Sequence, residues 1–270
     1  MIRNSLRALL YHKVTPRWEV GVTWVTPLAF RRQMKKLAEA GWQTILPDEQ
    51  GMTTDERKEF LLIFDDGYEC IYRYAFPVLK DLGFSAVIFI PSGYIGRMND
   101  WDHHLLGRRF GHLTLEMLNE LTAAGWIIGS HTVSHVDLLR LRDDLLGLEI
   151  GGSRRELQAA TGQQLNWISY PFGRYDQRVV DASIKAGYSG AVVPVCRRSV
   201  DVPDGFDLIV ADAVYRWDTP KMVLNRLEQG DGYCAGRWLR RIVNGFSVGT
   251  VVWRRLFPFR NHSEPLAIDG

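Results

Sequence analysis

Short apolar runs alternate with helix-like patterns along most of the chain, and this alternation limits the fold more strongly than any other feature. The strand-like runs are residues 7–14, 42–46, 59–64, 85–90, 126–130, 165–170 and 189–195. The helix-like segments are residues 26–41, 69–83 (interrupted by Pro77), 114–125, 143–161 and 176–187. Repeated strand–helix units predict a parallel α/β sheet or barrel. In such folds the chemistry collects where strands end and loops begin.

The composition is that of a globular protein with one large domain or two small ones. The chain has 270 residues, of which 46% are hydrophobic and 24% are charged. The formal net charge of +2 is too small to indicate a nucleic-acid partner, and no nucleic-acid-binding motif is present. The three cysteines, Cys70, Cys196 and Cys234, are not closely paired, so they suggest neither a disulfide scaffold nor a Cys-rich zinc site.

Neither a signal peptide nor a membrane-spanning helix is expected. The first apolar run is short and is broken by Arg7 and His12, whereas a signal peptide needs a longer apolar region. No run of about 20 apolar residues occurs in the chain. We therefore expect a cytoplasmic protein.

Two adjacent carboxylates, Asp65 and Asp66, follow the strand-like run at 59–64 and precede Gly67. Asp and Gly are common turn residues, so the simplest interpretation is a turn. Two like charges this close also repel each other, which costs stability unless a cation or a shared proton relieves the repulsion. The pair therefore raises the question of whether a metal ion binds here.

Two histidines, His131 and His135, follow the strand-like run at 126–130 and lie four residues apart. On a helical turn this spacing would put both imidazoles on one face, within reach of a single metal ion. The alternative is a capped turn whose histidines have no ligand role. Their place at a strand end favours the ligand pair.

A third candidate site segment, "SYPFG" at residues 169–173, ends the run at 165–170. Pro171 has no N–H group, so the first free backbone donors after it are Phe172 and Gly173, which could stabilise an oxyanion. One carboxylate and two imidazoles would bind a divalent ion and leave positions open for water and substrate. The other carboxylate could then take a proton from water, as hydrolysis of a carbonyl centre requires.

These motifs resemble, in order and spacing, those of the polysaccharide deacetylases, the NodB-type domain of carbohydrate esterase family four. Residues 63–67 match the family's "TFDDG", residues 131–135 match its H-[ST]-x-x-H, and residues 171–173 match its Pro-Tyr-Gly turn. The opening "LLYHKV" resembles the "YHRV" start of one branch. The likeness covers about residues 6–215.

The resemblance implies a distorted (β/α) barrel of about seven units, which we expect over residues 1–225. The composition changes after it, to a basic, aromatic-rich extension at 226–270. It implies removal of an N-acetyl or other N-acyl group from a sugar in a polysaccharide or in a lipid- or nucleotide-linked precursor, as in exopolysaccharide or cell-envelope biosynthesis. The alternative is a catalytically impaired carbohydrate-binding protein with the same barrel.

The resemblance also assigns roles to individual residues. Asp65 would be the general base. The metal ligands would be Asp66, His131 and His135, holding one divalent ion, most simply Zn²⁺ with Co²⁺ or Ni²⁺ as alternatives. The segment that binds the substrate and its oxyanion would be Tyr170, Pro171, Phe172 and Gly173.

The chain departs from the family pattern at three places. Ser169 stands where many members carry an arginine directed at the catalytic aspartate, so support for Asp65 would come from elsewhere or be absent. Phe172 replaces the usual tyrosine. The late Leu-x-His motif is missing, and we expect His12, at the end of the first strand, to be the general acid. The alternative for His12 is a hydrogen bond to a backbone carbonyl.

Two further segments carry open interpretations. His103, His104 and His112 lie in an insert and are expected to be loop residues near the mouth of the site, with a second metal site as the alternative. Residues 236–260 combine arginines with tryptophans and could lie on an anionic membrane surface or pack on the barrel as a helix. The sequence makes no prediction of oligomeric state.

Overall fold

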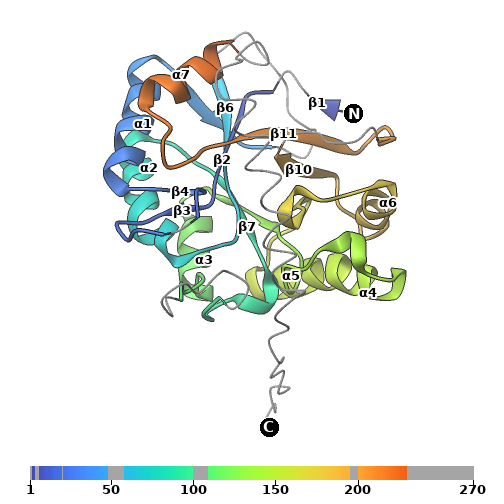
Figure 1. Cartoon of the computed structure of the whole chain (residues 1–270). Coiled ribbons are helices and arrows are strands. Elements are labelled where there is room, and N and C mark those ends of the chain that lie inside the picture. Colours follow the sequence, from blue (N-terminus) through green and yellow to red (C-terminus); the bar gives the residue numbers. More distant parts are fainter. Residues whose placement is uncertain are drawn as a thin grey trace. The chain divides into compact units, whose positions relative to one another are not determined.

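A closed barrel of seven parallel strands forms the centre of the part that the structure describes (Figure 1). In this computed structural model, the described residues are 2–3, 6–19, 21–47, 58–99, 109–194 and 200–229. The barrel strands, in spatial order, are β2 (Ala8–Tyr11), β6 (Glu59–Phe64), β7 (Val87–Ile90), β8 (Ile127–Ser130), β9 (Trp167–Ser169), β10 (Gly190–Pro194) and β11 (Asp207–Ala213). Pairing of β11 with β2 closes the barrel, which confirms the predicted (β/α) architecture.

Four short strands supplement the barrel. β1 (Ile2–Arg3) pairs with β11, and β5 (Gln43–Ile45) pairs with β6. β3 (Lys13–Val14) and β4 (Trp24–Val25) form a ladder of their own. The strand predicted at 7–14 is therefore two strands, and the break between them falls at His12.

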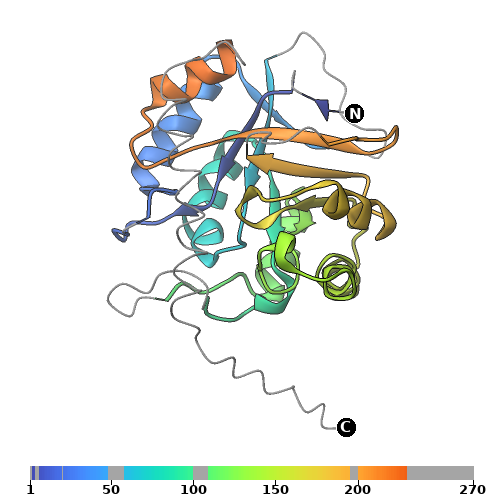
Figure 2. The same ribbon diagram turned by 45° about the vertical axis from the view of Figure 1, so that its right-hand side comes forward.

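Helices surround the barrel on its outside, as Figures 1 and 2 show. The α-helices are α1 (Pro27–Glu39), α2 (Phe76–Leu82), α3 (Leu115–Ala123), α4 (Asp143–Gly147), α5 (Ser153–Thr161), α6 (Gln177–Lys185) and α7 (Pro220–Gln229). A π-helical turn leads into α2, and another joins α4 to α5, so the helices predicted at 69–83 and 143–161 are each continuous. Pro77 comes just after the π-helical turn, and the helix continues through it without the predicted interruption.

The helix starts follow local capping rules. The side chain of Thr26 accepts a hydrogen bond from the amide of Ala29, and Pro27 occupies the first turn of α1, as predicted. Thr114 caps α3 in the same way.

Strand β11 and helix α7 were not predicted. Helix α7 crosses the domain boundary predicted at residue 225, and that boundary stays a prediction.

The core has two parts because side chains alternate between the two faces of each strand. The outward side chains pack under the helices: Phe64 stacks on Trp126 with ring centroids 5.6 Å apart. The inward side chains fill the barrel: the ring of Trp167 lies so close to Gly190 that a Cβ there would be 2.3 Å from it. Replacing Phe64 with alanine would cost about 3–5 kcal/mol of stability.

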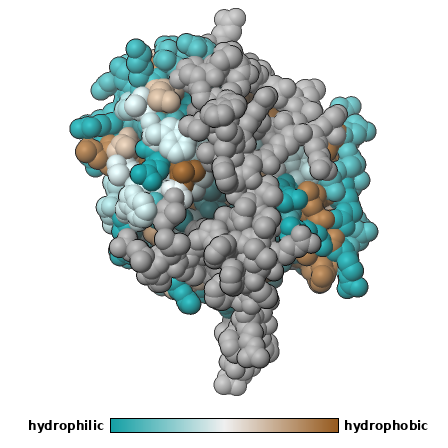
Figure 3. All heavy atoms as spheres, in the orientation of Figure 1, coloured by the Kyte–Doolittle hydropathy of each residue, from teal (hydrophilic) through white to brown (hydrophobic). Residues whose placement is uncertain are grey.

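All of these elements belong to one compact unit, Met1–Cys234. No helix among the described residues is long and apolar enough to cross a membrane. The described surface visible in Figure 3 is mostly hydrophilic, with small separate apolar patches. Residues 230–270 of the predicted extension lie outside the described residues.

Candidate active site

The predicted site residues each follow the carboxyl end of a barrel strand. Asp65 comes directly after β6, His131 after β8 and Tyr170 after β9, while His12 follows β2. Because parallel strands end at the same mouth of a barrel, these four ends lie on one side of the molecule.

The turn after β6 is tightly constrained. The amide of Asp65 donates to the carbonyl of Tyr11 (3.0 Å), which holds the start of the turn against β2. Asp66 then has a left-handed φ of 70°, and Gly67 a φ of 62°. A Cβ on Gly67 would lie 2.7 Å from Cδ1 of Ile90, and the left-handed φ also favours glycine there. Left-handed backbone at a non-glycine residue such as Asp66 is costly and is concentrated at functional sites.

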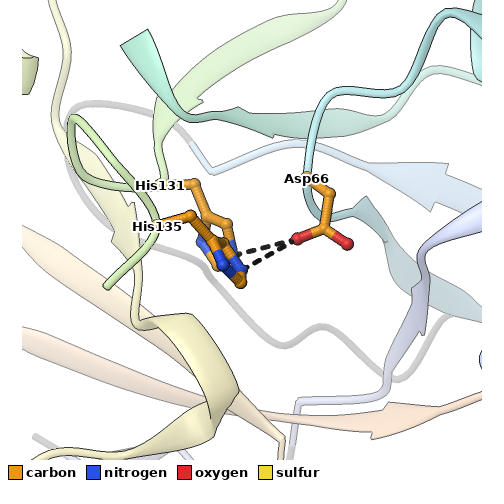
Figure 4. Close-up of side chains that lie close together, drawn as sticks. All are labelled: Asp66, His131 and His135. Carbon is orange, nitrogen blue, oxygen red and sulfur yellow. Dashed lines mark ion pairs between the residues drawn. The ribbon is translucent and has the colours of Figure 1, made fainter. Parts of the chain in front are cut away.

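Three side chains converge on one point at the mouth (Figure 4). The Nε2 atoms of His131 and His135 lie 3.4 Å and 3.2 Å from Oδ1 of Asp66. The three candidate ligand atoms all lie within 4.8 Å of one another, and all three residues are buried. A carboxylate with two imidazoles fits Zn²⁺ and similar divalent ions.

The ring of His131 is fixed from behind. Its Nδ1 lies 2.8 Å from the carbonyl of Ser169, which accepts the Nδ1 proton, so Nε2, on the Asp66 side, is the nitrogen that could bind a cation. A ligand histidine needs this tautomer when Nε2 binds a cation. The observed hydrogen bond thus supports the predicted ligand role.

The segment that carries the two histidines is a loop and not the helical turn on which their spacing would place both imidazoles on one face. Thr132 and His135 both have left-handed φ values, 67° and 53°. Side chains hold this conformation in place. One carboxylate oxygen of Glu149 accepts hydrogen bonds from the amides of Val133 and Ser134, both at 2.9 Å, and the other accepts the hydroxyl of Ser134. These contacts stabilise the observed loop.

The two adjacent carboxylates have opposite electrostatic character. Burial raises the pKa of Asp65, the positive charges of His131 and His12 oppose that rise, and the charge of Asp66 adds to it. Burial would also raise the pKa of Asp66, but hydrogen bonds from His131 and His135 outweigh burial and hold its pKa well below the usual range. Two neighbouring acids shifted in opposite directions are typical of a ligand beside a base.

One carboxylate oxygen of Asp65 accepts a hydrogen bond, and the other accepts none among the described residues. Its Oδ2 accepts a hydrogen bond from the hydroxyl of Ser169 at 3.0 Å. Its Oδ1 is buried and has no hydrogen-bond partner among the described residues. Sequence reasoning missed Ser169 because it looked there for an arginine. The signal was a small hydroxyl side chain at an inward-facing strand position.

His12 lies close enough to the two aspartates for its charge to affect the pKa of each. The residue is half-buried, and its Nδ1 atom is buried without a hydrogen-bond partner among the described residues. Nδ1 is therefore not bonded to a backbone carbonyl there, which was the alternative. The role of His12 as general acid stays a prediction.

The turn at Pro171–Gly173 needs two corrections. The amide of Gly173 donates to the carbonyl of Tyr170 at 2.9 Å, so Gly173 is not a free donor. The side chain of Tyr170 is in the core, where its hydroxyl donates to Ser183 at 3.1 Å and burial raises its pKa. Phe172 has a φ of 60° and packs its ring on His135, with ring centroids 4.8 Å apart. Of the two predicted oxyanion donors, the amide of Phe172 therefore stays a prediction.

His112, expected near the mouth of the site, is buried. Its ring stacks on Tyr68 with centroids 4.9 Å apart, and its Nδ1 lies 3.1 Å from the carbonyl of Arg97. Burial lowers its pKa to about 4, so it is neutral at pH 7. Among the described residues, the group that could hold a metal ion is Asp66, His131 and His135, without His112. His103 and His104 lie outside the described residues.

A model of the polysaccharide deacetylase family matches residues 53–191, just over half of the chain. The chain is 33% identical over 193 residues to YxkH of Bacillus subtilis (strain 168), whose name assigns it to the polysaccharide deacetylases. That match covers 70% of this chain and 64% of YxkH. An uncharacterized 30.6 kDa protein of Geobacillus stearothermophilus is 26% identical over 134 residues, which cover 49% of this chain and 44% of that protein. The chain thus spans less than two thirds of the length of both relatives.

Solved structures share the fold. The deacetylase PplD of Streptococcus pyogenes, in complex with acetate, matches with a TM-score of 0.69 at 22% identity, over 82% of this chain and 97% of that one. IcaB of Ammonifex degensii matches with a TM-score of 0.68 at 24% identity, over 83% of this chain and 97% of that one. At these identities the likeness shows the fold alone, while the matched family model shows the family. The chain therefore belongs to the polysaccharide deacetylase family.

Proposed function

We propose that the chain is a metal-dependent hydrolase that removes an N-acetyl or other N-acyl group from a sugar in a polysaccharide or in a lipid- or nucleotide-linked precursor. One observation carries this proposal most directly. The buried group of Asp66, His131 and His135 lies beside a second carboxylate, Asp65, that has an oxygen free to accept a proton.

We assign one divalent ion to Asp66, His131 and His135, most simply Zn²⁺, with Co²⁺ and Ni²⁺ as alternatives. Bound at these residues, the ion would polarise the acyl oxygen of the substrate and lower the pKa of a water molecule. The chain's own contribution is the fixed ligand geometry, which the Ser169 carbonyl and the Glu149 carboxylate support.

The proton transfers fall to two side chains. Asp65 accepts a proton from the attacking water as its oxygen adds to the acyl carbon. The amide of Phe172 donates to the oxygen of that carbon as negative charge develops on it. His12 gives a proton to the sugar nitrogen as the carbon–nitrogen bond breaks, and the products are a carboxylic acid and an amino sugar.

The second candidate function is carbohydrate binding without turnover. It is motivated by the missing late histidine and by the serine in place of an arginine at position 169. Acetate release separates the two. The purified protein, loaded with Zn²⁺, is incubated with N-acetylglucosamine oligomers, N-acetylated polysaccharides and lipid-linked N-acetylated sugars. Release above the rate of the His131→Ala variant supports the hydrolase. Sugar binding without release from any of these supports the alternative.

A further inference from the structure

The structure assigns to Ser169 the task of orienting the base, and so identifies Oδ1 of Asp65 as the atom that takes the proton; this inference rests on the proposed function. The Ser169 hydroxyl donates to Oδ2 of Asp65 at 3.0 Å. The two side chains are almost entirely buried, with residue exposures of 0% and 3%. We treat Ser169 as a positioning residue, because it acts on substrate only through Asp65.

The hydrogen bond spans the mouth of the barrel. Asp65 follows β6 and Ser169 ends β9, and strands β7 and β8 lie between them in the sheet. The backbone of this turn is also held, since the amide of Asp65 donates to the carbonyl of Tyr11, but that bond leaves the Asp65 carboxylate free to rotate. A hydrogen bond to an ionised carboxylate is short-ranged and strongly directional, and burial strengthens it. It therefore restricts rotation of the Asp65 carboxylate about its own axis.

The hydrogen bonding of the two Asp65 carboxylate oxygens determines which of them accepts the proton. Oδ2 already accepts the serine hydroxyl, while Oδ1 is buried and has no hydrogen-bond partner among the described residues. An acceptor left without a partner in a buried site is unfavourable and is drawn to the next donor that enters. A water molecule in the site would be that donor. After the transfer the proton sits on Oδ1, and Oδ2 still accepts the hydroxyl, so the step needs no rearrangement of Ser169.

Ser169 contacts the site through two different atoms, and this makes the inference testable. Its hydroxyl holds Asp65, whereas its backbone carbonyl holds Nδ1 of His131 at 2.8 Å. Replacing the side chain removes the first contact and leaves the carbonyl in place. Ser169→Ala should therefore impair turnover while metal binding stays intact. A general disturbance of the site would impair both.

The test compares three variants of the Zn²⁺-loaded protein on an N-acetylated glycan that the wild type deacetylates. In Ser169→Ala, kcat should fall about tenfold to hundredfold, as expected for a lost bond to a charged group. KM and zinc content should stay within about threefold of wild type. Ser169→Thr keeps a hydroxyl and should recover most of kcat. Ser183→Ala is the matched control: its hydroxyl is equally buried, donates to the carbonyl of Val179 at 2.9 Å and accepts from Tyr170 at 3.1 Å, and has no contact with Asp65.

A second measurement tests the hydrogen bond without turnover. In the metal-free protein, Ser169→Ala should lower the midpoint of urea unfolding more in the wild-type background than in an Asp65→Ala background. Equal shifts in the two backgrounds would overturn the inference. So would a kcat of Ser169→Ala equal to that of Ser183→Ala, or a change in KM alone. A wild-type protein that deacetylates no N-acylated sugar refutes the proposed function instead, and the inference falls with it.

Discussion

Replacing Glu149 with alanine should weaken metal binding although Glu149 touches no metal ligand side chain. Its carboxylate accepts three hydrogen bonds from Val133 and Ser134, inside the loop that joins His131 to His135. That loop contains two left-handed non-glycine residues, which the free chain disfavours. Without Glu149 the loop would relax, and metal binding would have to restore its conformation.

The expected magnitude follows from the number and burial of these bonds. Hydrogen bonds to a charged acceptor contribute about 1.5–3 kcal/mol each when buried. Glu149 is only partly buried, so water replaces much of what is lost. We therefore take about 1.5–3 kcal/mol for the whole set. If metal binding supplies that free energy, affinity falls roughly 10- to 150-fold.

Calorimetric titration of the metal-free protein with Zn²⁺ measures this directly. Glu116→Ala, which removes an exposed carboxylate from the first turn of α3, serves as the control and should bind Zn²⁺ like wild type. An affinity of Glu149→Ala within about threefold of that control would show that the loop holds its shape without the carboxylate.

The remaining predictions concern the ligands, the general acid, the pH dependence and the extension. His131→Ala should lose the metal; stoichiometric Zn²⁺ in the purified variant would remove it from the ligand set. His12→Ala should bind Zn²⁺ normally and lose more activity on an amide than on an activated ester, whose leaving group needs no proton, so equal losses on both would refute the acid role. In the metal-free protein, burial lowers the pKa of His131, but the charges of Asp65 and Asp66 outweigh burial and raise it. Protonated His131 therefore stabilises the fold fully below its unfolded pKa of about 6.5, and this stabilisation is lost as pH rises through the folded pKa. Urea unfolding from pH 6 to 9 should show this loss in wild type and not in His131→Gln. Deleting residues 236–260 should reduce binding to anionic lipid vesicles and leave activity on a soluble substrate unchanged; unchanged vesicle binding would exclude a membrane role.

Local patterns were enough to predict most of the barrel. The predicted strand at 59–64 is β6 with the same ends, because a strand buried on both faces needs a run of apolar residues, here Phe60 to Phe64. Strand β11 was missed. This strand begins with Asp207 and carries a second aspartate, Asp212, near its end, so it does not look like an apolar run. Its burial depends on pairing with β2, which closes the barrel and which no local pattern reveals.

The site was predicted at the level of residue types but not of contacts. The spacing of His131 and His135 suited one face of a helical turn, but the structure has a loop there, whose amides bind Glu149, 15 to 16 residues away in the sequence. Strand alternation could have excluded the side chain of Tyr170, since neighbouring residues point to opposite faces and Ser169 points inward. The hydrogen bond between Ser169 and Asp65 joins residues 104 apart, and only the folded barrel brings them together.

The central claim is that Asp65 is the base beside a metal held by its neighbour, and one comparison tests it most directly. Wild type and Asp65→Asn are loaded with Zn²⁺, and acetate release from the same N-acetylated glycan is measured together with zinc content. We expect Asp65→Asn to retain one Zn²⁺ per chain and to lose about 10²- to 10⁴-fold in rate. A rate within about threefold of wild type, with zinc retained, would contradict the assignment of Asp65 as the base.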